Sequence, residues 1–201
     1  MMRTTIATVA LTVILAGPAL ANPVGRDPTL APKGDYGLDK RHASLIVKIP
    51  HMGGFSKFTM RFDRMDGGFT LDSANWATTP ATLTIDAASI DTGLPEFDKT
   101  IAGPAYFNAA KYPTISFTAR KAEAVDGQGT LTGDLTFLGV TKPVVLDVTF
   151  NGYGPGMLGV GTRMGFSGTG HIKRSDFGLT TMSQFAGDDL DLIFDVEFVR
   201  K

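Results

Sequence analysis

The sequence contains no cysteine among its 201 residues. This absence excludes disulfide bonds, cysteine nucleophiles, cysteine-ligated zinc, iron–sulfur clusters and c-type haem attachment. Disulfide-free exported proteins are common in the bacterial periplasm and unusual among small secreted animal domains. The missing thiols therefore narrow both the chemistry and the compartment that fit this chain.

The chain also lacks an excess of charge of either sign. Its 19 lysine and arginine residues nearly balance 20 aspartate and glutamate residues, giving a formal net charge of −1. Proteins that bind nucleic acid or anionic membranes carry basic patches instead. The composition therefore predicts neither nucleic acid nor an anionic membrane as a partner.

Histidines are few, and their spacing matches no metal-binding motif. His42, His51 and His171 are the only ones, and none stands in a His-Glu-x-x-His pattern. Ser44 and Ser56 lack the Gly-x-Ser-x-Gly context of a hydrolase nucleophile. The sequence thus predicts no catalytic residue, no metal site and no cofactor.

One apolar run stands out, and it lies at the N-terminus. Residues 6–15 follow Arg3, are too few to span a bilayer as a stable helix, and are followed by small residues at Ala19 and Ala21. This arrangement is typical of a secretory signal peptide over residues 1–21. We favour it over a retained anchor because the run is short. Cleavage after Ala21 would place the protein in the periplasm and make its net charge one unit more negative.

Residues 22–34 carry three prolines and no periodic pattern, so they are predicted to form a flexible arm. Residues 35–201 have the length of one domain and can bury a core. Within them, apolar and polar residues alternate in about eight segments, which is typical of half-buried strands. Such a meander protects its edges best by closing into an antiparallel up-and-down barrel. One helical insertion is expected at Pro95–Ala102, and turns are expected at Asp66-Gly67-Gly68 and Asp126-Gly127.

The clearest alternation lies in a predicted hairpin over residues 131–150. Leu131, Leu135 and Phe137 share one face of its first strand. Gly139 and Pro143 are expected to bracket its turn. Residues 160–172 read as a further strand with several glycines. Glycine inside a strand often marks sharp curvature or room left for a ligand.

Four segments, in chain order, resemble the YceI-like family of periplasmic polyisoprenoid-binding proteins. The resemblance rests on Leu38-Asp39 with His42, on Phe107-Asn108 followed by Tyr-Pro-Thr-Ile-Ser-Phe at 112–117, on Gly-Asp-Leu-Thr-Phe-Leu-Gly-Val-Thr-Lys-Pro-Val at 133–144, and on Ile-Lys-Arg-Ser-Asp-Phe-Gly at 172–178. The resemblance implies a lipocalin-like, eight-stranded barrel around a long apolar pocket. It also implies an isoprenoid ligand (a polyprenyl chain or an isoprenoid quinone) or a fatty amide, an exported location and often a homodimer, without catalysis.

A prenyl tail needs a long dry cavity with adaptable walls, and 14 phenylalanines and 8 methionines favour such a pocket. The alternative for any single side chain is ordinary core packing. The candidate ligand contacts are Phe58, Met60, Phe62, Ile115, Phe117, Leu135, Phe137, Met164, Phe166, Arg174, Phe177 and Phe194.

Arg174 has two interpretations: a cation at the barrel mouth that meets a polar head group, or a structural ion pair with Asp176 or Asp39. The structural pair is the favoured interpretation. Three functions other than lipid carriage stay open: a lipid-modifying barrel enzyme, a quinone-delivery partner of a membrane redox protein, and a filled barrel without a ligand.

Overall fold

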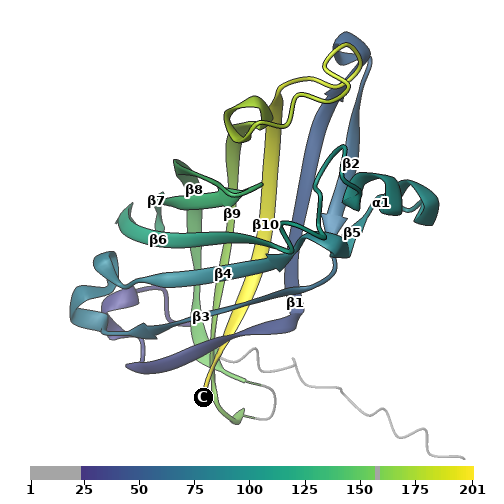
Figure 1. Ribbon diagram of the computed structural model, residues 1–201. Helices are drawn as coiled ribbons and strands as arrows, with labels where there is room; N and C mark the ends of the chain where they lie inside the picture. The colour runs from purple at the N-terminus through teal and green to yellow at the C-terminus, as the bar shows by residue number, and fades with distance from the viewer. Residues whose placement is uncertain (1–23, 157–158) are drawn as a thin grey trace, which may run out of the picture.

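The computed structural model describes residues 24–156 and 159–201 and shows an antiparallel barrel (Figure 1). Eight strands close the barrel, because β10 pairs with β9 on one side and with β1 on the other. In the order of their pairing, these strands are β1 (Gly34–His51), β3 (Met65–Leu71), β4 (Ala81–Asp86), β6 (Thr114–Val125), β7 (Gln128–Phe137), β8 (Val140–Pro155), β9 (Thr162–Lys173) and β10 (Asp189–Arg200). The predicted all-β, eight-stranded barrel is confirmed.

The long strand β1 pairs with two different strands along the same edge. Its first residues, 34–37, pair with β3, whereas residues 46–51 pair with β2 (Ser56–Phe62). On its other side it pairs with β10, and this ladder is interrupted between Leu38 and Ala43. The interruption lets β1 change direction and belong to both parts of the sheet.

Short elements cover one end of the barrel beside β2. They are η4 (Ala87–Ser89), β5 (Ile90–Asp91) and the expected helix α1 (Pro95–Ala102). Proline at the first helical position and Gly103 directly after the helix suit its two ends. Among the described residues, no helix has the length and apolar character needed to cross a bilayer.

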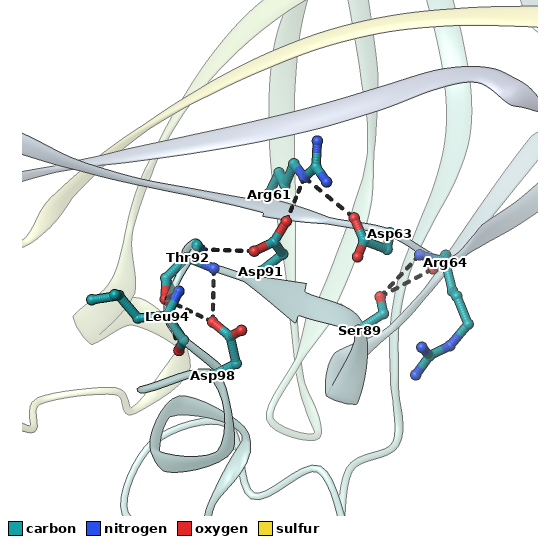
Figure 2. Close-up of polar contacts among 9 residues, drawn as sticks. Arg61, Asp63, Arg64, Ser89, Asp91, Thr92, Leu94 and Asp98 are labelled. Atoms are coloured by element: carbon teal, nitrogen blue, oxygen red, sulfur yellow. Dashed lines mark hydrogen bonds and ion pairs between the residues drawn. The ribbon is translucent and has the colours of Figure 1, made fainter. Parts of the chain in front are cut away.

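Polar contacts fix this end of the barrel (Figure 2). Arg61 Nε donates to Asp91 Oδ2 at 2.8 Å and joins β2 to β5. The backbone N–H and the hydroxyl of Thr92 both donate to Asp98 Oδ1 at 2.7 Å, which ties α1 to the strand before it. The cover is therefore attached to the barrel through side chains as well as through the chain itself.

Two predicted turns are wrong in position. Asp66-Gly67-Gly68 lies inside β3, where a Cβ on either glycine would clash with a carbonyl oxygen of an adjacent strand. The glycines permit close strand approach there rather than a turn. In the predicted hairpin, the connection between β7 and β8 consists of Leu138 and Gly139, both with positive φ, whereas Pro143 pairs with Asp134 inside the ladder.

Residues 24–33 of the predicted arm contact the barrel. Gly25 and Tyr153 exchange two backbone hydrogen bonds of 2.8 Å, and η1 (Pro28–Leu30) follows. The carbonyl of Ala31 then accepts a hydrogen bond from the buried Ser73 hydroxyl at the start of η3 (Ser73–Thr78). These contacts dock the arm on the barrel. The predicted signal peptide, residues 1–21, lies outside the described residues.

Candidate functional site

A cavity of about 810 Å³ occupies the barrel between β3, β4 and the strands from β6 to β10. Its size lies toward the upper end of the range of small-molecule sites. Aromatic and aliphatic side chains from opposite strands form its wall, among them Leu45, Phe69, Leu83, Phe117, Leu131, Leu135, Leu146, Val148, Phe150, Phe166, Leu192, Phe194, Val196 and Phe198. Period-2 alternation explains this wall, because every second residue of a strand points inward.

The charged residues of the cavity gather where η1, η3 and the β6–β7 turn approach the lumen. We call this region the mouth, and it contains all four charged residues of the described lining: Arg26, Asp27, Glu123 and Asp126. The Thr29 hydroxyl and N–H donate to Asp27 and lower the pKa of that carboxyl. Lys121 likewise lowers the pKa of Glu123. An apolar tail can therefore leave water while a polar head stays beside ionised groups.

Five of the twelve predicted ligand contacts line this cavity. They are Phe117, Leu135, Met164, Phe166 and Phe194, which come from β6, β7, β9 and β10. Whether they touch a ligand stays a prediction. Their convergence on one lumen is what the alternation of apolar residues led us to expect.

Another five lie in the packed end of the barrel, away from the cavity. Phe62, Phe137 and Phe177 form a row of rings together with Phe107, with successive centroids 5.1–6.1 Å apart. Met60 and Ile115 are also buried and are not among the residues that line the cavity. We call the four rings the aromatic plug. The expectation that these five residues face the cavity is corrected, because side chains that point inward at this end fill the barrel.

Phe58 is also outside the cavity. It is only partly buried, and its ring meets Phe97 of α1 edge-on at a centroid distance of 5.6 Å. Phe58 therefore packs against the helical insertion rather than lining the lumen, whereas Met60 and Phe62 of the same strand β2 are buried in the core.

Arg174, in η6 (Arg174–Phe177), fits neither expected role. It is buried, with 4% of its surface exposed, and donates to the carbonyls of Leu179, Thr181, Ala186 and Gly187 at 2.6–3.0 Å. It lies at the end of the barrel opposite the mouth, and it bonds neither Asp176 nor Asp39. The guanidinium instead holds the segment that connects η6 to β10.

The carboxylate of Asp39 is held by Arg163. Arg163 Nη1 donates to Asp39 Oδ2 at 2.6 Å and to Glu197 Oε2 at 2.9 Å, and His42 Nδ1 lies 2.9 Å from the same Asp39 oxygen. Arg163 and His42 hold the pKa of Asp39 well below its usual range. Although Asp39, His42 and Glu197 are close enough to share a metal ion, the Arg163 guanidinium already pairs with both carboxylates. The cluster fastens the bend of β1 to β9 and β10.

Sequence reasoning missed several residues of the cavity. Phe69 and Phe198 meet Phe166 and each other edge-on along the wall, and Phe150 packs against Phe166 with a tilted ring. The alternation along β8 and β10 could have identified Phe150 and Phe198. Phe69 followed an apparent turn, and the mouth residues of the arm have no periodic signal.

Comparison with known proteins places the chain among similar barrels. Residues 36–198 match the YceI-like domain. Protein YceI of Escherichia coli O157:H7 is 38% identical over 169 residues, which are 83% of this chain and 87% of that protein. The crystal structure of Burkholderia cenocepacia BcnA has a TM-score of 0.70 at 25% identity, over 80% of this chain and 98% of that one. A polyisoprenoid binding domain from Saccharophagus degradans has a TM-score of 0.62 at 19% identity, over 83% of this chain and 98% of that one.

Proposed function

This chain belongs to the YceI-like domain family, and from that premise we propose that it binds and carries a long-chain isoprenoid-type lipid. The tail occupies the barrel cavity, and the head group stays at the mouth. Carriage takes place in the periplasm, after export by the N-terminal segment 1–21. The protein sequesters the lipid without changing it.

The observation that carries this proposal is an apolar lumen whose charged residues all lie at one end. Burying each methylene of a tail contributes about 0.8 kcal/mol, so a long chain gains affinity along the whole wall. The name of the Saccharophagus degradans domain, a polyisoprenoid binding domain of the same fold, points to the same class of ligand. The carboxylates of the described lining, Asp27, Glu123 and Asp126, lie at the mouth and not along the apolar wall, which favours carriage of the tail over chemistry on it.

The test is the mass of the lipid that accompanies the protein. Protein purified without detergent is examined by native mass spectrometry. The bound material is then extracted, and its molecular mass is measured. We expect a long-chain prenyl lipid or quinone in the wild type. Protein that is empty and takes up neither a quinone nor a prenyl lipid on incubation would overturn the proposal.

A matched pair of variants locates the binding. Leu135→Asp puts a carboxylate into the apolar wall and should remove most of the bound lipid, because burying an unpaired charge is costly. Thr136→Asp changes the next residue of β7, whose hydroxyl bonds Thr141 on the exposed side. It should leave the lipid content unchanged. Equal lipid content in the two variants would show that the lipid binds elsewhere.

A further inference from the structure

Three cavity-facing side chains lie directly over glycines of a neighbouring strand. A Cβ on Gly170 of β9 would come within 2.5 Å of Leu146 Cδ2, and a Cβ on Gly168 within 2.5 Å of the Phe194 ring. Both are directly opposed pairs in their ladders. In β7, the Phe117 ring covers Gly133 in the same way. We call Gly133, Gly168 and Gly170 the wall glycines.

The wall glycines let the side chains that cover them lie against the barrel wall. Leu146, Phe117 and Phe194 all line the cavity, and each uses the volume that a side chain on the glycine would occupy. A side chain at the glycine would push them toward the barrel axis, because real Cβ atoms do not approach other atoms so closely. The width of the lumen thus depends on three residues that have no side chain.

Gly165 is another glycine of β9, and it serves as a comparison because the strand backbone does not require a glycine at its position. Gly165 has a φ outside the left-handed region, and a Cβ on it would meet only Asn151 Cβ at 3.5 Å, an ordinary contact. It therefore tolerates a side chain, whereas Gly168 and Gly170 of the same strand do not. At Gly170 the obstacle is the Leu146 side chain, and at Gly168 it is the Phe194 ring together with the carbonyl oxygen of Asp147.

We propose that the wall glycines select the ligand by the cross-section of its chain. This inference rests on the proposed function and specifies its substrate class. A polyprenyl chain carries a methyl branch at every repeat and is wider than a straight acyl chain. The flat wall admits the branched chain, and filling a glycine position narrows the lumen until only the thinner chain fits.

The test compares Gly170→Val with Gly165→Val, two β-branched substitutions in one strand. Gly170 is chosen because its nearest neighbour is the end of a flexible side chain, whereas Gly168 and Gly133 also face backbone oxygens. The probes are geranylgeraniol and hexadecanol, two alcohols of equal main-chain length, of which only the first is branched. Affinity is measured by fluorescence competition, and folding is checked by thermal unfolding.

We expect Gly170→Val to weaken geranylgeraniol binding by about tenfold or more, as overpacking costs suggest, with a much smaller change for hexadecanol. Gly165→Val should change neither. Adding Leu146→Ala to Gly170→Val should restore the branched alcohol, and Gly170→Ala replaces Gly170→Val if the valine variant does not fold. If Gly170→Val changes the affinity for both alcohols equally, or changes neither, this inference is overturned. The proposed function still stands in that case, provided that the wild type binds geranylgeraniol. A wild type that binds neither alcohol overturns both.

Discussion

Arg174 Nη2 donates a hydrogen bond of 2.9 Å to the carbonyl oxygen of Ala186. This contact is one of four that join the buried guanidinium to backbone carbonyls between residues 179 and 187. The segment they hold also receives a hydrogen bond from Met52 and donates one to Pro50. One arginine thus fixes the loop that closes the end of the barrel opposite the mouth.

Replacing Arg174 by methionine should destabilise the fold without removing the ligand. Four carbonyls would lose their charged donor, and we expect a loss of about 3 kcal/mol or more in the free energy of unfolding. Arg120→Met is the control, because its ion pair with Asp134 is largely exposed and should contribute less than about 1 kcal/mol. Urea unfolding measures both. If folded Arg174→Met protein lost its lipid at unchanged stability, Arg174 would be a head-group ligand after all.

The Asp39 cluster predicts a dependence of stability on pH. The pKa of Asp39 is lower in the folded state than in the unfolded chain, where it is about 3.9. The ionised carboxylate therefore contributes fully to the free energy of unfolding above that pH, and this contribution is lost progressively as the pH falls toward the lower pKa of the folded state. Asp39→Asn should therefore destabilise the protein by about 1–3 kcal/mol at pH 7. The difference from the wild type should shrink as the pH falls below 4.

Thermal unfolding at several pH values checks this. Asp147→Asn serves as the control, because Asp147 makes no ion pair within the described part of the chain. If the wild type is more stable than Asp39→Asn by the same amount at pH 7 and at pH 3, the stabilising role assigned to the ionised Asp39 carboxylate is contradicted.

The aromatic plug should govern stability rather than binding. Phe137→Ala removes a ring that is 6% exposed and lies between Phe107 and Phe177. We expect a loss of about 3–5 kcal/mol, from burial and from the void left behind. The lipid bound per folded molecule should stay the same, as measured by extraction after size-exclusion chromatography. Loss of lipid from folded Phe137→Ala protein would place the ligand at this end of the barrel.

The docked arm should slow the escape of the ligand. Deleting residues 22–30 removes η1 and the mouth residues Arg26, Asp27 and Thr29. Release of a bound prenyl lipid to acceptor vesicles should become several-fold faster, whereas the barrel ladders are untouched. Ser73→Ala, which removes the hydrogen bond to the Ala31 carbonyl, should accelerate release to a smaller extent. Unchanged release in the deletion variant would show that the arm does not cover the mouth.

For the strands with clear alternation, the sequence predicted which side faces inward. The period of two in the backbone sets this locally, so Leu135, Phe166 and Phe194 could be assigned to the interior without any knowledge of the fold. It also predicted the bounds of α1, since Pro95 and Gly103 act within one turn of the helix. The meander of about eight strands predicted a closed barrel, and the resemblance of four segments to the YceI-like family implied the same fold.

The position of each inward residue along the barrel follows from the three-dimensional packing and not from local alternation. Phe137 and Leu135 are two residues apart on the same face, yet one joins the aromatic plug and the other lines the cavity. That difference depends on the stagger of distant strands and on which loops fill one end, and neither is encoded in local periodicity. The partners of Arg174 and the docking of the arm were hidden for the same reason: backbone carbonyls and irregular segments carry no pattern in the sequence.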